Sequence, residues 1–181
     1  AMNEAAARAV KGVRNVITLP SGVAVLATGY WAAKKGRDAL AVQWDLGTAA
    51  DLSVAKVHKM LSEGVANASA VAKETGSLNT GAAAAKRKLQ ATYEVPYLAH
   101  ACMEPMNCTA QVKDGAVEVW VPTQVPGMAR AIAAKVAGVD ADKVTLHVTL
   151  LGGGFGRRLD VDYVAQAVRV AMACGGKPVQ L

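Results

Sequence analysis

Aromatic side chains are scarce in this chain. They make up 4% of its 181 residues and include a single phenylalanine, Phe155. The core must therefore be built mostly from Ala, Val and Leu, which supply most of the 52% of residues that are hydrophobic. Together with 19% charged residues, this composition indicates a globular protein and excludes an intrinsically disordered one. The length predicts one or two domains.

Cysteine and histidine are also few, with three of each. An odd number of cysteines argues against a disulfide framework, and three is one fewer than a four-cysteine zinc site or an iron–sulfur cluster requires. Cys102 and Cys108 could form a disulfide, but free buried thiols are the favoured interpretation. His58, His100 and His147 lie far apart, so the sequence predicts no metal site made by its own side chains.

Long runs of one residue class are missing as well. No stretch approaches the roughly 18 apolar residues of a membrane span. The formal charge is +6, but the basic residues are scattered and do not alternate with aromatic ones, so no nucleic-acid partner is predicted. A solvated basic surface is the favoured interpretation, and an anionic cofactor or a partner subunit also fits.

The two ends of the sequence indicate a piece of a longer chain. Ala1 precedes Met2, and no secretory signal pattern follows them. The last residues, "GGKPVQL", stop where a new strand is expected to begin.

The first half predicts a hairpin, two helices and a strand. Two β-branched runs over 13–29 flank the turn residues Pro20, Ser21 and Gly22. A helix over 30–40 and a strand over 41–45 are expected to bring Trp31 and Trp44 together as core anchors. Apolar spacing predicts a second helix over 48–64.

Small and polar residues dominate 64–85, which we expect to form a linker or a long surface loop. This places the main domain boundary near residue 85. Beyond it the sequence predicts a series of regular elements: an extended strand over 89–101, a hairpin over 106–124 with an Asp114-Gly115 turn, a helix over 125–139, a strand over 142–150, and a helix over 160–176 with Asp160 as its N-cap.

A glycine-rich segment, "GGGFGRR", lies between the last predicted strand and helix. It contains Gly152, Gly153, Gly154, Phe155, Gly156, Arg157 and Arg158. Main-chain N–H groups at such a turn attract anions, glycines let a ligand approach the backbone, and arginines suit phosphate. The Rossmann pattern fails because an arginine stands at its third glycine, and the Walker pattern fails as well. The loop alone leaves ligand binding and a ligand-free turn equally open.

Four segments read in order are more specific. "AHACMEP", "DGAVEVWVPTQ", "VAGVDADKVTLHV" and "GGGFGRR" resemble the molybdenum-binding subunits of the xanthine dehydrogenase and aldehyde oxidase family. The similarity runs from about Tyr93 to Leu181. It looks most like the isoquinoline 1-oxidoreductase β-subunit branch, which includes proteins described as membrane-bound aldehyde dehydrogenases. "GVAVLATGYWAAKKGRDALAVQWD" resembles the end of the family's α/β-hammerhead domain.

The resemblance implies an α+β fold in two parts. Residues 1–85 would be the C-terminal part of an α/β-hammerhead-like domain plus a linker. Residues 86–181 would be the first part of a molybdopterin-binding domain, with a mixed sheet and packed helices. The implied cofactor is molybdenum-molybdopterin in its cytosine dinucleotide form, bound by the full-length protein.

The resemblance also implies which residues contact the cofactor: Gly153, Gly154, Phe155, Gly156, Arg157 and Gln124. Each side chain has a structural alternative. Phe155 could be a buried turn anchor, Gln124 could close the strand-to-helix turn, and the two arginines could face solvent. One arginine is expected to pair with a carboxylate or phosphate at the cofactor or at a domain interface. His100 and Glu104 could orient one another, with Glu104 in a structural role rather than as a general base.

The implied activity is hydroxylation at carbon with water as the oxygen source. The family's catalytic glutamate and iron–sulfur clusters lie outside these residues, so no catalytic residue is expected here and the fragment alone should be inactive. The implied partners are a small [2Fe-2S] subunit and a cytochrome c acceptor. The compartment stays open between periplasmic, membrane-associated and cytoplasmic.

Two departures from the family pattern bear on the substrate. Some relatives carry a glutamine where this chain has Leu98, and purine-oxidising relatives carry a glutamate where it has Leu159. An N-heterocyclic aromatic or an aldehyde therefore fits better than a purine. The alternative is a non-catalytic interaction domain that has lost the cofactor.

Overall fold

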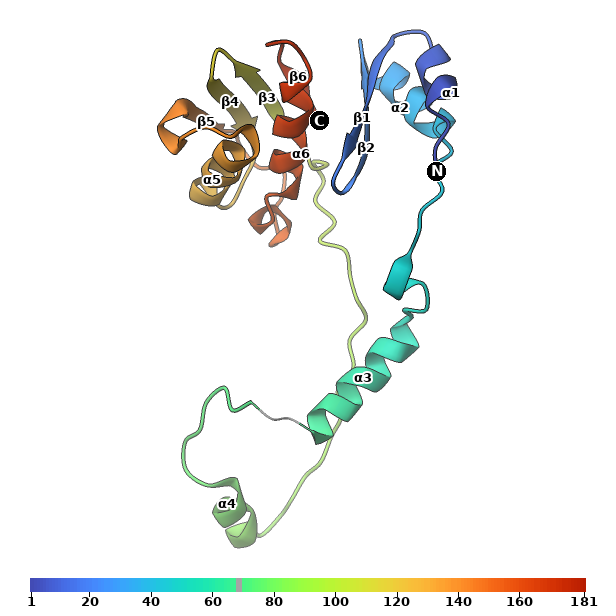
Figure 1. Cartoon of the computed structure of the whole chain (residues 1–181). Helices are drawn as coiled ribbons and strands as arrows, with labels where there is room; N and C mark the ends of the chain where they lie inside the picture. The colour runs from blue at the N-terminus through green and yellow to red at the C-terminus, as the bar shows by residue number, and fades with distance from the viewer. Residues whose placement is uncertain (68–69) are drawn as a thin grey trace. The chain divides into compact units, whose positions relative to one another are not determined.

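The structure, a computed structural model, describes residues 1–67 and 70–181. Two units separate within it (Figure 1): one holds Ala1–Gln43 and Leu98–Leu181, and the other holds Trp44–Tyr97. The assignment of 1–85 and 86–181 to two family domains stays a prediction, because contacts within the chain do not show to which domain of the family a segment corresponds.

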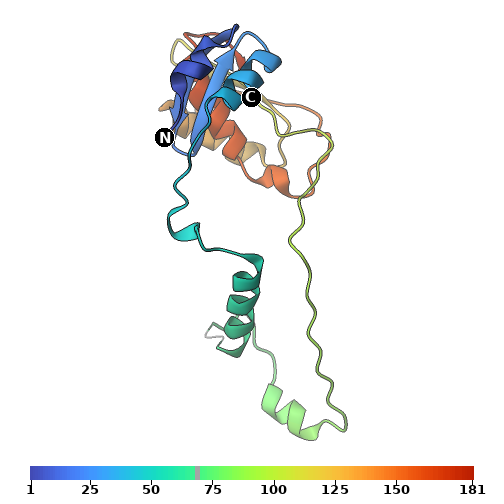
Figure 2. The ribbon, with the colours of Figure 1, turned by 90° about the vertical axis from the view of Figure 1, so that its right-hand side faces the viewer.

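A β-hairpin and two helices form the N-terminal part. Strands β1 (Val13–Leu19) and β2 (Gly22–Ala27) pair in antiparallel fashion, as predicted. Helices α1 (Glu4–Ala9) and α2 (Tyr30–Ala39) lie on the same face of this hairpin (Figures 1 and 2). Helix α2 confirms a prediction, whereas α1 was not predicted; the side chain of Asn3 caps it by accepting from the Ala6 N–H at 3.1 Å.

The predicted strand over 41–45 and the tryptophan pair are wrong. No strand forms there within the described residues, and Ala41 has a φ of +44°. Trp31 and Trp44 are 71% and 64% exposed. Helix α2 instead turns Gly36 toward the hairpin, where an added Cβ would lie 2.7 Å from Val13 Cγ2. Trp31, five positions earlier, lies roughly 140° around the helix and so faces away from the strands.

The unit Trp44–Tyr97 contains a 3-10 turn, η1 (Gly47–Ala49), and two helices, α3 (Val54–Ala66) and α4 (Leu78–Ala84). Helix α3 begins later than predicted, because Ser53 Oγ accepts from the Lys56 N–H at 3.2 Å and caps it. Part of the predicted loop over 64–85 is the helix α4, and residues 68–69 of that loop lie outside the described residues. The predicted strand over 89–101 is wrong, because these residues pair with no strand that the structure describes, and Ala101 has a left-handed φ of +50°.

A four-stranded mixed sheet forms the rest of the first unit, in the order β5-β4-β3-β6. Strands β3 (Thr109–Lys113) and β4 (Ala116–Val121) form the predicted hairpin. Asp114 and Gly115 connect them with φ values of +50° and +75°, the signature of a tight hairpin turn. Strand β5 (Val144–Val148) runs parallel to β4, and β6 (Val179–Gln180) runs antiparallel to β3.

Two helices cover this sheet, and Figure 1 shows them on the same face. Helix α5 (Pro126–Ala137) joins β4 to β5 and ends at Gly138, which adopts a left-handed φ of +71°. Helix α6 (Asp162–Met172) follows the glycine loop. The fully buried core between helices and sheet is aliphatic, as the scarcity of aromatics predicted: Val119, Val121, Ala129, Ala133, Val164, Ala167 and Val168. The α+β fold with a mixed sheet and packed helices is thereby confirmed.

Two local predictions in this part need correction. Asp160 does not cap α6: the N-cap is Val161, and a short 3-10 helix, η3 (Arg157–Leu159), intervenes before it. On β5, the alternation in the sequence puts Val144 and Val148 on one face, but Val144 is buried and Val148 is 52% exposed. Among the described residues, no helix is both long and apolar enough to cross a membrane.

Candidate cofactor-binding site

The sheet topology brings three separate segments to one edge. Strands β4 and β5 are parallel, so their carboxyl ends meet there, and open sheets commonly bind ligands outside such ends. Residues 122–124 leave β4 at this edge, and the glycine loop leaves β5. Because β3 is antiparallel to β4, the segment before β3, residues 100–108, arrives at the same edge.

Close neighbours require the glycines of the loop. Gly153 and Gly156 have φ values of +103° and +90°, which glycine adopts without strain. A Cβ at Gly152 would collide with the Cβ of Glu104, and one at Gly154 would lie 2.7 Å from Gln124 Oε1. The loop is therefore held against both of the other segments with no room for side chains.

Phe155 differs from the glycines around it. Its φ of +49° is strained for an aromatic residue, and its side chain is 74% exposed. The alternative of a buried turn anchor is therefore wrong. The ring stands at the tip of the loop, where it can line a ligand site.

The carbonyl groups of the loop are bound from the protein side. Gly153 O accepts from Arg158 Nε at 2.7 Å, and Gly154 O accepts from the Arg157 N–H at 2.8 Å and from Cys102 Sγ at 3.3 Å. Within residues 1–67 and 70–181, the N–H groups of Gly153, Gly154 and Phe155 find no acceptor. These donors are free for an anionic or oxo group.

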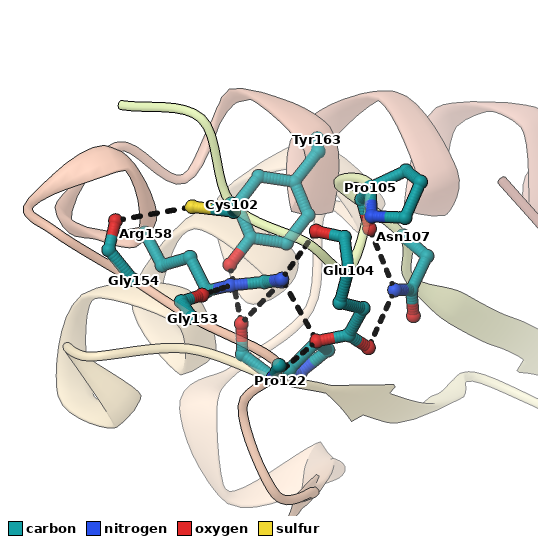
Figure 3. A network of polar contacts seen from close by, with 10 residues as sticks. Cys102, Glu104, Pro105, Asn107, Pro122, Gly153, Gly154, Arg158 and Tyr163 are labelled. Atoms are coloured by element: carbon teal, nitrogen blue, oxygen red, sulfur yellow. Dashed lines mark hydrogen bonds and ion pairs between the residues drawn. The ribbon is translucent and has the colours of Figure 1, made fainter. Parts of the chain in front are cut away.

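Arg158 is fully buried at the centre of the site (Figure 3). Besides Gly153 O, its guanidinium donates to Pro122 O at 3.3 Å and to Glu104 O at 3.0 Å, and pairs with Glu104 Oε2 at 2.8 Å. One side chain thus links the glycine loop, the end of β4 and the segment before β3. One arginine was predicted to pair with a carboxylate or phosphate, and the structure pairs both with carboxylates, Arg158 with Glu104 and Arg157 with Asp162. The solvent-facing alternative is wrong for Arg158.

Glu104 is the acceptor hub of the same network. Its Oε1 accepts from Asn107 Nδ2 at 2.8 Å, and its Oε2 accepts from the Gly152 N–H at 2.8 Å as well as from Arg158. The hydrogen bond from Asn107, that from Gly152 and the nearby guanidinium lower the pKa of this carboxyl. His100 is not among the hydrogen-bond partners of Glu104 in the described structure; it lies beside Gly156 instead.

Arg157 and Gln124 lie on the outer side of the loop. Arg157 forms a two-pronged ion pair with Asp162, at 3.0 and 2.8 Å, which raises the pKa of the guanidinium. Gln124 is exposed. Its side-chain Oε1 accepts from the Gly156 N–H at 3.2 Å, and its main-chain N–H donates to Arg158 O at 3.2 Å. Gln124 therefore closes the turn, as its structural alternative predicted, while its amide nitrogen donates to none of the described residues.

The cysteines take no part in a disulfide. All three are free, so the Cys102–Cys108 pairing is wrong. Cys108 is buried, and burial raises the pKa of its thiol to about 12. Cys102 and Cys174 are only partly buried.

A family model for the molybdopterin cofactor-binding domain matches residues 57–181. This chain belongs to that family. The sequence resemblance to the molybdenum-binding subunits of the xanthine dehydrogenase and aldehyde oxidase family is thereby confirmed.

Individual members of the family show the same likeness. The isoquinoline 1-oxidoreductase subunit beta of Brevundimonas diminuta is 31% identical over 96% of this chain. The membrane-bound aldehyde dehydrogenase [pyrroloquinoline-quinone] of Gluconacetobacter polyoxogenes is 34% identical over 88% of it. The crystal structure of quinoline 2-oxidoreductase from Pseudomonas putida 86 shares the fold with a TM-score of 0.72 at 17% identity, over 99% of this chain and 28% of that one. The chain spans 24% and 21% of the two sequence relatives.

The geometry fits the cofactor that the family name states. An anionic group needs backbone donors, and the loop offers three N–H groups that have no acceptor among the described residues. Molybdenum-molybdopterin is therefore the cofactor class of this domain.

Sequence reasoning missed the residue at the centre of the site. It named Arg157 among the residues that contact the cofactor and gave Arg158 no such role, because only the fold decides which of the two arginines is buried. It also missed Tyr163, a 2% exposed residue whose hydroxyl donates to Pro122 O at 3.0 Å, and Asn107. The signal for Arg158 was its spacing from Gly153. It stands five residues later, so one 3-10 turn lets its side chain reach back to the Gly153 carbonyl.

Proposed function

We propose that this chain is part of the large subunit of a molybdenum hydroxylase that oxidises an N-heterocyclic aromatic compound or an aldehyde. The cofactor would be the cytosine dinucleotide form of molybdenum-molybdopterin. The observation that carries the proposal is the glycine loop, whose three free N–H groups lie at the carboxyl edge of the parallel strand pair.

The loop residues have separate roles in this proposal. Gly153, Gly154 and Gly156 would form the main-chain surface that faces the cofactor, and the N–H groups of Gly154 and Phe155, which have no acceptor among the described residues, would donate to it. The exposed Phe155 ring would line the site that holds the cofactor. Gln124 supplies its free amide nitrogen, and Arg157, with 28% of its side chain exposed, supplies a cation at the rim.

The reaction would convert R–H and water into R–OH, two electrons and two protons. The bound cofactor supplies the two-electron oxidation and the site at which water oxygen is activated. The electrons would pass to a small [2Fe-2S] subunit and then to an acceptor such as cytochrome c. The relative from Brevundimonas is itself named as a beta subunit, which supports a multi-subunit assembly.

Two leucines support the choice of substrate class. Leu98 is 83% exposed and Leu159 is 51% exposed, and neither offers a hydrogen bond. Recognition of a purine relies on polar groups that pair with the ring, and sites lacking such groups do not select for it. A flat apolar heterocycle or an aldehyde is the better match.

Isotope transfer tests this proposal on the full-length protein, purified with its partner subunits from a host that makes the cofactor. Quinoline-type heterocycles and aromatic aldehydes would be supplied in water labelled with oxygen-18, with a dye as the electron acceptor. With a heterocycle, the proposal predicts one labelled oxygen atom in the product for each two electrons delivered. With an aldehyde it predicts at least one, because the carbonyl oxygen of an aldehyde also exchanges with water through its hydrate. The 181-residue chain alone should give no turnover. A folded complex that holds no molybdenum and oxidises no compound of either class would instead support a non-catalytic interaction domain that has lost the cofactor.

A further inference from the structure

We infer that Arg158 is a positioning residue for the cofactor loop: its buried guanidinium fixes the direction of the Gly154 N–H, and Glu104 holds that guanidinium in place. This inference rests on the proposed function and adds a residue that does not itself touch the cofactor. It concerns the one arginine of the pair that the sequence could not assign to a role.

The contact with Gly153 sets the direction of the loop. A trans peptide is planar, and its C=O and N–H point in opposite directions. Arg158 Nε holds the Gly153 carbonyl inward at 2.7 Å, so the N–H of the same peptide unit, that of Gly154, points outward. This N–H is one of the three that find no acceptor among the described residues.

The other contacts of Arg158 fix the guanidinium itself. It is fully buried and bonds to Pro122 O, Glu104 O and Glu104 Oε2, which belong to segments outside the loop. A planar group bound at several points cannot rotate. The guanidinium therefore holds the Gly153 carbonyl at a fixed position relative to the end of β4 and the segment before β3 (Figure 3). Lysine would keep the charge but could not bond to all of these acceptors from one rigid plane.

Glu104 provides the balancing charge. A buried guanidinium without a carboxylate would be strongly destabilised, and Glu104 is the carboxylate that contacts it, at 2.8 Å. The same carboxylate accepts the Gly152 N–H, so it holds the loop directly one residue before the Arg158 contact. The pair therefore bonds to the main chain on either side of the Gly152–Gly153 peptide, at the Gly152 N–H and at the Gly153 carbonyl.

The test compares Arg158→Lys and Glu104→Gln with the wild type in the full-length holoenzyme. The control is Arg130→Lys, since Arg130 also donates to a backbone carbonyl, Ala141 O at 2.7 Å, but lies on α5 away from the loop. Three readouts are needed: molybdenum per large subunit, the electron paramagnetic resonance spectrum of the partly reduced protein, and kcat and KM measured separately.

We expect Arg158→Lys to retain molybdenum, to shift the resonance spectrum, and to lower kcat about 100-fold with KM changed less than about threefold, because an N–H misplaced by about 1 Å costs that much. Glu104→Gln should shift the spectrum in the same direction by less, and the control should match the wild type. A merely structural role would lower the yield of folded protein without moving the spectrum of what remains.

Loaded variants with an unchanged spectrum and a kcat within twofold of the wild type would overturn the inference alone. If Arg158→Lys does not fold, Glu104→Gln decides: a shifted spectrum supports the positioning role, and an unchanged one contradicts it. A wild-type complex that contains no molybdenum would overturn the proposed function together with this inference.

Discussion

At the scale of single residues, the site depends on where side chains are missing. The glycine loop passes so close to Glu104 and Gln124 that the Cβ of an alanine would meet them. The same closeness explains how Arg158 reaches the loop carbonyl from a buried position. Substitutions here should act through steric contact and lost hydrogen bonds rather than through hydrophobic burial.

Gly152→Ala should disrupt the loop. Its Cβ would collide with the Cβ of Glu104, so the hydrogen bond from the Gly152 N–H to Glu104 must lengthen. We expect a loss of stability of about 1–3 kcal/mol and a lower molybdenum content in the full-length protein. Gly127→Ala is the matched control, because nothing lies within 4 Å of its Cβ and it stands in the first turn of α5. Equal stability and equal loading of the two variants would rule out the steric account.

Acid should weaken the ion pair between Arg158 and Glu104. The pKa of Glu104 is lowered in the folded protein, by hydrogen bonds from Asn107 and Gly152 and by the nearby guanidinium. A lowered folded pKa contributes stability above the ordinary value of 4.5, and this contribution is lost as the pH falls through the folded pKa. Hydrogen exchange of the hydrogen-bonded loop amides, above all that of Gly152, which donates to Glu104, should therefore be unaffected between about pH 7 and 5. It should accelerate, beyond the intrinsic pH effect, only below about pH 4.5.

The matched variant for this pH effect is Glu104→Gln, which removes the titrating group. Its loop amides should exchange faster than those of the wild type at neutral pH and show no additional acceleration in acid. A wild-type loop whose protection is lost already at pH 6 would contradict the assignment to Glu104.

Cys108 should be chemically inert in the native protein. Its thiol is buried and its pKa is raised to about 12, so almost no thiolate forms at pH 8. Iodoacetamide at pH 8, followed by peptide mass spectrometry, should label Cys108 only after the protein is unfolded in urea. Labelling of the native thiol at the rate of the unfolded one would show that this part of the core opens readily.

At the scale of elements, local signals were sufficient only where the partner is close in sequence. The two hairpins, α2, α5 and α6 were predicted because a tight turn or an apolar periodicity specifies each of them. The strands over 41–45 and 89–101 were wrong, since an extended segment becomes a strand only if a distant partner pairs with it. Arg158 was undecided for the same reason: burial is set by three segments that are far apart in the sequence.

Helix α2 offers a test of packing against propensity. Gly36 is buried in this helix, and an alanine Cβ would lie 2.7 and 2.9 Å from side-chain carbons of Val13 and Val25. Gly36→Ala should therefore destabilise the protein by about 1–3 kcal/mol despite the better helix propensity of alanine. Gly64→Ala, in α3 with nothing within 4 Å, should stabilise its helix by up to about 1 kcal/mol. Thermal unfolding followed by circular dichroism measures both, and the same sign for both variants would refute the packing argument.

At the scale of the whole molecule, the chain spans 24% of the length of its relative from Brevundimonas. In the proposed function, its loop residues bind and orient the cofactor and transfer no proton. The resemblance predicted the family and the fold class from four short motifs. It could not predict how the loop is held, because the contacts of Arg158 depend on the folded sheet edge.

The most direct measurement is the molybdenum content of the full-length protein, purified with its co-purifying subunits from a host that makes the cofactor and analysed by plasma mass spectrometry. The account predicts about one molybdenum atom per large subunit, and a much lower content in Gly152→Ala. A folded wild-type complex without molybdenum would contradict it, and would leave the glycine loop as a structural turn in a protein that binds something else.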